Sequence, residues 1–415
     1  MNRRVLVVSL QVSASSSKGH INPLVAVVER LVTSGHRVGW MSLPSALGAE
    51  DRRQVAGTGA VLVEPRRVPP ERPVDERQLS AWAMDPQRAW QAYRSFLLDA
   101  AARMIAPARE EMAAFRPDVV LVDSMSYAGV IAAAALGVPY VGVCAGLKSL
   151  KEGGFEGGYM HDLSPLLPER TALFAQHGMH PEFRLLECLS PHANVVFATR
   201  ALVGDVPLPL RTLLVGPSIP RGARGDEVDF PWDRLAADRP IVHAAFGSVH
   251  TRERLGDLVL PLAEATAGLG AQLVISSEAL SRELPCLPGD PLIVPYSPQL
   301  RLLQRVSAFV THGGANSVME AVWAGAPLLV VPLSGDQVWQ AHLVARSGVG
   351  LALPRAELTV ANLRTALAQL VDMSGPVRRR MQAARESYRL ADGAAMTAGI
   401  ALDLATKADH ALARA

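Results

Sequence analysis

The sequence predicts an α/β fold with two doubly wound domains, each built on a parallel sheet, that face each other across a cleft. Its 415 residues are too many for one ordinary hydrophobic core and favour two domains of about 200 residues each. Short runs rich in β-branched residues alternate with longer segments of helical spacing in both halves. These runs are apolar throughout, which is typical of strands covered by helices on both faces.

Eight such runs are expected to form strands. In the first half they are VLVVSL (5–10), DVVLVD (118–123) and PYVGV (139–143), and in the second half IVHAAFG (241–247), QLVISS (272–277), LIVPY (292–296), AFVTHG (308–313) and PLLVVP (327–332). One turn is also repeated: AALGVPYVGV and AVWAGAPLLVV each end a helix at glycine and begin a strand after proline. The repetition indicates two domains of the same architecture.

A segment rich in proline, glycine and charge, residues 218–240, separates the halves. The predicted division is an N-terminal domain of residues 1–218, a linker of residues 219–238 and a C-terminal domain of residues 239–393. A last helix, residues 394–415, has no strand after it and is expected to pack back on the N-terminal domain. In doubly wound domains ligands bind at the carboxyl ends of the strands, so the predicted cleft is where a ligand is expected.

Composition excludes several classes of protein. The net charge is only +2, which gives no reason to expect the clustered basic surface of a nucleic-acid-binding protein. Three cysteines, Cys144, Cys188 and Cys286, are far apart and lack a C-x-x-C pattern. A disulfide framework or zinc site is therefore not expected. We expect a reducing compartment, the cytoplasm.

Two apolar segments resemble membrane segments only at first sight. The run 5–10 is too short for the core of a signal peptide and is better explained as a buried first strand. The uncharged stretch 124–147 is long enough to span a bilayer, but Gly137 and Pro139 interrupt it. Because a proline inside a helix costs about 3 kcal/mol, we expect a buried helix, a turn and a strand, with no transmembrane segment.

The junction THGGANSVMEA (311–321) combines a strand end with the start of a helix expected near Asn316. The first N–H groups of a helix lack partners within it, and its dipole is positive there, so such an end binds anions. His312 and Ser317 can add side-chain donors to a phosphate. The alternative is a capping box between Ser317 and Glu320, which would satisfy the same amides internally.

Three other strand ends of the second half carry polar residues as well. The run 241–247 ends in Gly247 and Ser248, the run 292–296 is followed by SPQ (297–299), and the run 327–332 by LSGDQ (333–337). A sugar nucleotide needs a flat ring for its base, a carboxylate for its ribose, donors for its phosphates and an acid–amide pair for its sugar. Together these strand ends supply that set.

The stretch 296–337 resembles the nucleotide-sugar signature of family 1 glycosyltransferases, which are inverting enzymes similar to UDP-glycosyltransferases and have the GT-B fold. The resemblance extends over essentially the whole chain, including GHINP (19–23) and LLVGP (213–217), and implies an enzyme of the bacterial natural-product type. The donor residues that it implies are Gly19, Gly247, Ser248, Tyr296, Ser297, Gln299, His312, Gly314, Asn316, Ser317, Glu320, Asp336 and Gln337.

The resemblance implies a role for most of these residues. Tyr296 stands where the family usually has a tryptophan that stacks on uracil, and the backbone of Ser297 would meet the edge of the base. Gln299 and Glu320 would bind the ribose hydroxyls. The resemblance implies a UDP-sugar as the donor. Because tyrosine replaces tryptophan, and Ala315 replaces a bulkier residue, a dTDP-sugar is the alternative.

The phosphates and the transferred sugar involve the remaining positions. His312 would contact the α-phosphate, and Ser248, Asn316 and Ser317 the β-phosphate. The acid–amide pair at 336–337 would hold sugar hydroxyls, which favours glucose over a heavily deoxygenated sugar.

The motif GHINP contains the expected general base, His20. Asn22 and Pro23 are helix-start signals, so His20 is expected in the loop at the carboxyl edge of the first sheet. A histidine with an ordinary pKa of about 6.5 suits a general base at neutral pH. Asp123 ends a neighbouring strand and can fix the tautomer of the imidazole. The alternatives are a loop histidine bonded to backbone and an aspartate that caps the next helix; in the family, this pair is catalytic.

The expected mechanism is a single displacement with inversion. His20 takes the proton of an acceptor hydroxyl, which attacks the anomeric carbon, and the helix end at 316–324 stabilises the leaving diphosphate. No cluster has the spacing of metal ligands, so metal independence is expected, with a nucleotide sugar as co-substrate and no permanent cofactor. Lys18 either contacts the diphosphate or is a solvated loop lysine.

Aromatic residues suggest where an acceptor binds. Residues 85–86 can open a helix that places Trp90, Tyr93 and Phe96 at three-residue spacing along one face. The glycine-rich segment 151–163 is expected to be a mobile loop over the same pocket. The alternative for the aromatic face is core packing. The expected acceptor-binding residues are Trp82, Trp90, Tyr93, Phe96, Phe155, Tyr159 and Met160.

By analogy with the family, the acceptor is expected to be a lipophilic small molecule such as a polyketide, macrolide or carotenoid. Three other functions remain open. They are a sugar-nucleotide epimerase, a catalytically inactive homologue that activates a partner, and a transferase acting on a lipid-linked precursor. The sequence leaves monomer and homodimer open.

Overall fold

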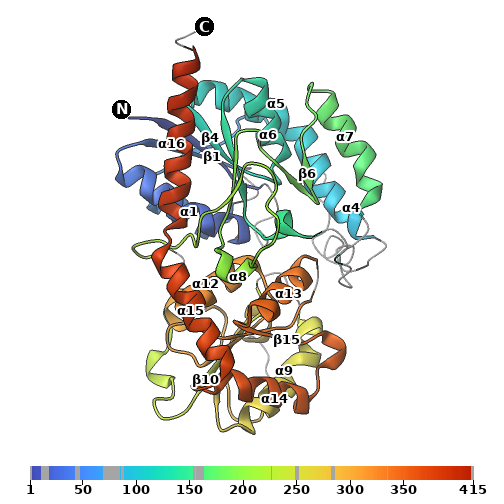
Figure 1. Ribbon diagram of the computed structural model, residues 1–415, viewed down its shortest axis with the longest axis vertical. Helices are drawn as coiled ribbons and strands as arrows, with labels where there is room; N and C mark the ends of the chain where they lie inside the picture. The colour runs from blue at the N-terminus through green and yellow to red at the C-terminus, as the bar shows by residue number, and fades with distance from the viewer. Residues whose placement is uncertain are drawn as a thin grey trace. The chain divides into compact units, whose positions relative to one another are not determined.

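The computed structural model describes residues 2–10, 18–42, 47–68, 85, 88–152, 155, 163–225, 227–247, 252–281, 286–333 and 335–412. The chain forms two compact units, each a parallel sheet flanked by helices (Figure 1). Unit 1 comprises Met1–Phe197, Val206–Gly225 and Asp392–Ala415, and unit 2 comprises Ala198–Asp205 and Asp226–Ala391.

Unit 1 contains a seven-stranded sheet in the order β3-β2-β1-β4-β5-β8-β9, and all of its neighbouring strands are parallel. The strands are β1 (Arg4–Val8), β2 (Arg37–Met41), β3 (Val61–Val63), β4 (Val119–Asp123), β5 (Tyr140–Cys144), β8 (Ala193–Val196) and β9 (Thr212–Leu214). A short antiparallel pair, β6 (Phe183–Arg184) and β7 (Glu187–Cys188), lies outside this sheet.

Unit 1 also contains helices that flank this sheet. They are α1 (Lys18–Thr33), α2 (Ala49–Gly57), α4 (Ala89–Tyr93), the π-helix η2 (Arg94–Asp99), α5 (Ala100–Phe115), α6 (Tyr127–Ala135), α7 (Leu167–Ala175) and α16 (Gly393–Leu412), with the short 3₁₀ turns η3 (Lys148–Leu150) and η4 (Ser164–Leu166). The C-terminal helix α16 packs beside α1 and against β4 and β5 (Figure 1).

Unit 2 contains a six-stranded parallel sheet in the order β12-β11-β10-β13-β14-β15. The strands are β10 (Ile241–Ala245), β11 (Gln272–Ser276), β12 (Leu292–Val294), β13 (Ala308–Thr311), β14 (Leu328–Val330) and β15 (Gly350–Ala352). The helices are α8 (Arg200–Val203), α9 (Arg252–Ala267), α10 (Glu278–Ser281), α11 (Gln299–Leu302), α12 (Ala315–Ala324), α13 (Gln337–Ser347), α14 (Val360–Val371) and α15 (Pro376–Leu390), with the 3₁₀ turns η5 (Trp232–Arg234) and η6 (Arg355–Glu357).

The predicted fold class is confirmed, and each of the eight predicted strands is present. Strands β2, β3, β8, β9 and β15 were not predicted. In β2, Gly39 interrupts the apolar run because a Cβ there would meet the ring of Phe115 at 2.8 Å. In β8, the buried Asn194 interrupts it, and its side chain bonds to the backbone of Ser190. Close packing in β2 and a buried polar bond in β8 therefore interrupt the apolar patterns from which these two strands could have been predicted.

The two units divide the chain at different residues from those expected. The sequence suggested one cut near residue 218, whereas residues 198–205, which include α8, belong to unit 2, and residues 206–225 belong to unit 1. Helix α8 packs against α13 and α15 of unit 2, where Arg346 Nη2 donates to the carbonyl of Val203 at 2.7 Å.

The stretch 124–147 forms α6, a turn and β5, as expected. No helix in the described part of the chain combines the length and the apolar character that a membrane span requires.

Each sheet reverses its strand order at one point. In unit 1 the reversal lies between β1 and β4, and in unit 2 between β10 and β13. In open α/β sheets the crevice outside the carboxyl ends of the strands at such a switch point is where ligands bind. Each unit therefore has one topologically favoured site.

Candidate active site

The switch point of unit 1 holds a histidine–carboxylate pair. His20 Nδ1 lies 2.6 Å from Asp123 Oδ2, and the carboxylate is almost completely buried. The other oxygen, Oδ1, accepts from the backbone N–H of Met125 at 2.9 Å. A buried carboxylate held in this way fixes Nδ1 as the protonated nitrogen, which leaves Nε2 as the acceptor. One oxygen of Asp123 thus supports the turn before α6, and the other forms the pair with His20. The N-cap residue of α6 is Ser126, so Asp123 does not cap the next helix, as the alternative had it.

The expected position of His20 in a loop is wrong, because α1 includes Lys18 and His20 lies within the helix. Asn22, read as a helix-start signal, does not cap α1: its Oδ1 accepts from Gln54 Nε2 of α2 at 3.1 Å. Pro23 lies inside the helix, where its missing N–H removes one backbone bond. The start signals failed because tertiary contacts of α2 occupy the side chain that would have capped.

Lys18 is not a solvated loop lysine. Its ammonium lies 3.0 Å from Asp51 Oδ1 and 3.2 Å from Glu50 Oε1, both on α2. Asp51 is buried, and Gln54, which also contacts Lys18 at 3.3 Å, is buried too. Helix α2 therefore holds α1 on both sides of His20, through Lys18 and Asn22.

The switch point of unit 2 is the N-terminal end of α12. The helix begins at Ala315 after Gly314, and within the described residues no side chain caps this N-terminus. Ser317 is therefore the third residue of the helix rather than its cap, and the capping-box alternative with Glu320 is wrong. The N-terminus of a ten-residue helix carries partial positive charge, which suits an anion.

His312 lies beside this helix end, at the end of β13, between two loop backbones. A Cβ on Gly314 would lie 2.7 Å from His312 Nε2, which favours glycine there. Gly247 has a φ of +75°, and its Cβ would lie 3.2 Å from Cε1 of the same ring, so glycine is favoured there too. Desolvation by the surrounding protein lowers the pKa of His312 to about 4, against the opposing charge of Asp336 and a backbone bond to Ala245. His312 is therefore neutral at pH 7.

Two of the proposed ribose ligands already contact each other. Gln299 Nε2, at the start of α11, donates to Glu320 Oε2 of α12 at 2.8 Å, and Glu320 is almost completely buried. Tyr296, just before them, is 38% exposed, whereas Ser297 is buried. An exposed ring, followed in the chain by a half-buried amide that is paired with a buried carboxylate, can accommodate a base and its ribose.

The acid–amide pair at 336–337 forms the start of α13. Asp336 is the N-cap residue, and its Oδ2 accepts from Gln340 Nε2 at 2.8 Å. Gln337 Oε1 accepts from the backbone N–H of Leu333 at 2.8 Å. Both side chains are thereby oriented by their own loop and helix.

The aromatic residues of unit 1 only partly follow the expected pattern. The α-helix ends at Tyr93 and continues as a π-helix from Arg94, so the three rings do not share one α-helical face. Trp90, Tyr93 and Phe96 pack against the core and stay half-buried, with the last two rings in edge contact at 5.1 Å. The core-packing alternative thus accounts for one side of these rings. π-Helical turns are frequent at functional sites.

Some candidate residues lie outside the described residues. These are Ser248, Trp82, Tyr159 and Met160, together with most of the glycine-rich segment 151–163, of which Phe155 is described and half-buried.

The sequence analysis did not single out Lys148, which begins η3 after β5. Its ammonium donates to Met125 Sδ at 3.6 Å, and Met125 is the residue whose N–H bonds to Asp123. The signal was available, because CAGLKSL (144–150) is a further polar strand end on the same sheet edge.

Known proteins resemble this chain in sequence. Residues 233–378 match the protein family described as UDP-glucoronosyl and UDP-glucosyl transferase. The NDP-glycosyltransferase YjiC of Bacillus subtilis (strain 168) is 26% identical over 389 residues, covering 91% of this chain and 92% of the relative. The oleandomycin glycosyltransferase of Streptomyces antibioticus is 27% identical over 391 residues, covering 89% and 85%.

Solved structures show the same fold. The glycotransferase of kitacinnamycin superposes with a TM-score of 0.74 at 23% identity, covering 97% of this chain and 99% of that one. The glycosyltransferase VinC in complex with dTDP superposes with a TM-score of 0.68 at 23% identity, covering 97% and 100%.

Fold and site together define a glycosyltransferase of the GT-B type, an enzyme that uses a nucleotide sugar as co-substrate. Within that class, the match over residues 233–378 and the two relatives that align along most of the chain support the predicted resemblance to family 1 glycosyltransferases.

Proposed function

We propose that the enzyme transfers a hexose, glucose first of all, from a UDP-sugar to a hydroxyl group of a lipophilic small molecule. The observation that carries this proposal is the 2.6 Å contact between His20 Nδ1 and the buried Asp123. A base of this kind removes a proton from an acceptor hydroxyl, which is the step that a transferase needs and a donor-binding protein does not.

The reaction is one displacement with inversion at the anomeric carbon. The acceptor O–H bond breaks as its proton passes to His20 Nε2, a bond forms between the acceptor oxygen and the anomeric carbon, and the bond to the diphosphate oxygen breaks. Asp123 stabilises the imidazolium that forms. No metal takes part in this proposed step.

The leaving diphosphate is stabilised by unit 2. The N-terminal amides of α12, with Asn316 and Ser317 in its first turn, supply donors for its charge. His312, held neutral by its lowered pKa, acts as a hydrogen-bond donor rather than as a cation. Donors fixed before the reaction stabilise developing charge without reorganisation.

Donor selectivity rests on the remaining residues of unit 2. Tyr296 stacks on the base, and the Gln299–Glu320 pair binds the ribose hydroxyls. Asp336 and Gln337, oriented at the start of α13, hold the hydroxyls of the sugar. A dTDP-sugar is the second candidate donor, because Tyr296 stands where the family has tryptophan and the similar VinC was solved with dTDP.

The acceptor is proposed to be a natural product of the polyketide, macrolide or carotenoid kind. The half-buried Trp90, Tyr93, Phe96 and Phe155 of unit 1 offer apolar surface for it. Two relatives are named for oleandomycin and for zeaxanthin. A reducing compartment, the cytoplasm, fits the three free cysteines.

The proposal is tested by incubating the full chain with UDP-glucose or dTDP-glucose and a panel of macrolides, aromatic polyketides and carotenoids. We expect a hexose mass increment on at least one acceptor, with nucleoside diphosphate released in equal amount. Release without an acceptor product, or epimerised donor, would contradict the transfer. Comparison of the two donors decides the base, and the β-configuration of a product from an α-linked donor would establish inversion.

A further inference from the structure

The chain passes between the units at four places, after Phe197, Asp205, Gly225 and Ala391. Within unit 1, the segment that ends at Gly225 contacts the segment that begins after Ala391. Gly393 N–H donates to the carbonyl of Pro217 at 3.0 Å. A Cβ on Gly393 would overlap the carbonyl of Gly216, so the two segments meet backbone to backbone. We call residues 216–225 and 392–393 the crossing segments.

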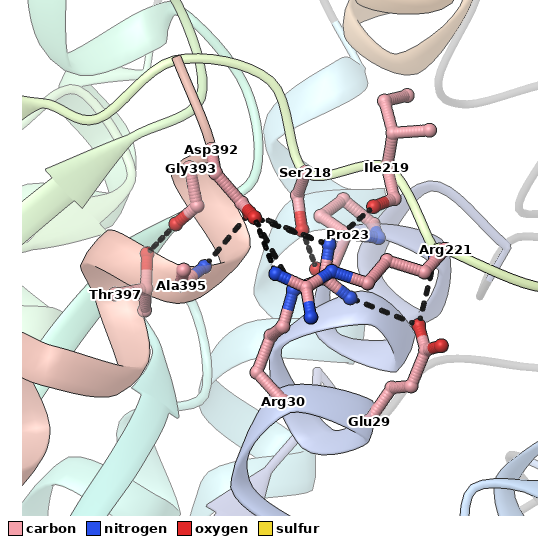
Figure 2. Close-up of polar contacts among 10 residues, drawn as sticks. All are labelled: Pro23, Glu29, Arg30, Ser218, Ile219, Arg221, Asp392, Gly393, Ala395 and Thr397. Atoms are coloured by element: carbon pink, nitrogen blue, oxygen red, sulfur yellow. Dashed lines mark hydrogen bonds and ion pairs between the residues drawn. The ribbon is translucent and has the colours of Figure 1, made fainter. Parts of the chain in front are cut away.

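Arg30 of α1 fastens both crossing segments to one helix (Figure 2). Its Nε and Nη2 each lie 3.3 Å from Asp392 Oδ2, and Nη2 also donates to the carbonyl of Ile219 at 3.3 Å. The Arg30 side chain is 10% exposed and the Asp392 side chain 40%, so solvent reaches the pair from the Asp392 side. Asp392 Oδ1 in turn accepts from Ala395 N–H at 3.0 Å, which ties the start of α16 to the same point.

Further bonds hold the first crossing segment along α1 and α2. Ser218 Oγ donates to the carbonyl of Pro23, and Arg221 N–H donates to Glu29 Oε2 at 3.1 Å (Figure 2). At the far end of this segment, a Cβ built on Gly225 would lie 3.5 Å from the Cα of Gln54 in α2. Gln54 is the residue that bonds Asn22, two positions from His20.

These contacts connect the crossing segments to the proposed base. His20 and Arg30 lie ten residues apart on one helix, about 15 Å along its axis at the ordinary rise. A helix transmits position over that distance as a rigid element. Transfer needs reacting atoms held within a fraction of an ångström, and misplacement of about 1 Å costs about 10²-fold in rate.

We propose that Arg30, Asp392 and Gly393 form a clamp that fixes where both crossing segments leave unit 1, and that Arg30 is thereby a positioning residue for sugar transfer. The clamp ties the helix that carries His20 to two of the four passages between the units. It rests on the proposed function for its consequence, because only a reaction that joins groups from both units depends on this connection. Donor binding, which uses residues of unit 2, does not.

A merely structural role would be to dock α16. A matched control addresses it, because Arg3 contacts Asp409 and Thr406 near the other end of the same helix. Arg3→Ala and Asp409→Asn each remove a contact between α16 and the rest of unit 1, and neither residue contacts a crossing segment. Each control should lower Tm about as much as the variants of the clamp do.

The first test compares Arg30→Ala, Asp392→Asn and Gly393→Ala with these controls. We expect kcat for transfer to fall at least tenfold in the three clamp variants while Kd for UDP and dTDP, by calorimetry, changes less than twofold. The controls should keep kcat within twofold. Should the controls lose as much kcat at equal loss of Tm, or should nucleotide affinity fall in step with kcat, the positioning role is overturned. Asp392→Asn keeps the test usable if Gly393→Ala does not fold.

The second test needs no activity. Cys286 of unit 2 is exposed whereas Cys144 and Cys188 are buried, so spin labels on Cys286 and on Lys407→Cys of the exposed face of α16 report the distance between the units. Arg30→Ala should broaden this distance distribution and Arg3→Ala should not. An unchanged distribution in Arg30→Ala refutes the clamp. If the wild-type chain transfers no sugar, the proposed function fails, and the label distances still decide on the clamp.

Discussion

Both units place a histidine at the switch point of a parallel sheet, yet the two histidines have opposite surroundings. His20 follows β1 and contacts a buried carboxylate, Asp123, at 2.6 Å. His312 follows β13 and lies against the backbones of Gly247 and Gly314, where desolvation lowers its pKa to about 4. The same topological position thus holds an imidazole paired with a carboxylate in one unit and a desolvated imidazole in the other.

The difference shows that the sheet determines where chemistry occurs, whereas the neighbouring side chains determine which chemistry it is. A carboxylate on one imidazole nitrogen stabilises the charged product of proton transfer. An imidazole whose desolvation outweighs the nearby charge of Asp336 resists protonation at neutral pH. Changes in the surroundings of either histidine therefore test this difference between the units.

The largest effect is expected from Asp123→Asn. An amide would favour the wrong tautomer of His20 and would not stabilise the imidazolium, so kcat should fall by about 10³-fold or more. The measurement is initial transfer rate together with UDP affinity by calorimetry. Affinity should be unchanged, because the donor residues belong to unit 2. If kcat falls less than tenfold, Asp123 is a turn cap and the contrast between the units disappears.

The second change is His312→Ala in unit 2. Removing one preorganised donor from the leaving diphosphate should lower kcat by about 10²-fold. Unlike Asp123→Asn, it should also weaken UDP binding. If His312→Ala lowers kcat but leaves the affinity for UDP unchanged, His312 is not a phosphate ligand. His342, which stacks on Trp339 elsewhere in unit 2, gives a matched control as His342→Ala.

The third prediction concerns pH and unit 2. The folded pKa of His312 lies below that of the unfolded chain, so the unfolded state binds more protons between pH 6.5 and 4. Stability present above pH 6.5 is therefore lost as pH falls, by about 2 kcal/mol between pH 7 and 5. The buried His243, also with a pKa of about 4, adds to this loss.

Urea unfolding at pH 7 and pH 5 measures this loss. In His312→Asn the difference between the two pH values should be smaller than in the wild-type chain. An identical difference would mean that His312 is not desolvated, and the electrostatic contrast with His20 would then be unsupported.

The smallest effect is expected from Phe155→Ala. Loss of one half-buried ring should change the acceptor KM by about tenfold or less, since burial of such a side chain contributes about 1.5–3 kcal/mol when complete. Donor hydrolysis without acceptor should stay unchanged. A collapse of donor hydrolysis would assign this residue to the donor rather than to the acceptor.

Local patterns carried much of the fold. Runs such as 118–123 and 308–313 were recognised because strands buried on both faces are apolar throughout, whatever surrounds them. Strands β2 and β8 were missed because Gly39 and Asn194 break the apolar pattern for reasons that lie in distant residues, Phe115 and Ser190. Helix α1 was expected to start too late for the same reason, since Asn22 bonds to Gln54 instead of capping.

Periodicity and the residue types close together in the chain were enough to predict the two doubly wound units and the order of polar strand ends. The contact of His20 with Asp123, the start of α12 at Ala315 and the bonds of Arg30 to both crossing segments depend on the folded chain. These contacts join residues up to 362 positions apart. Nothing in the local chain specifies such distances, because they arise when packing of the sheets and helices brings the segments together.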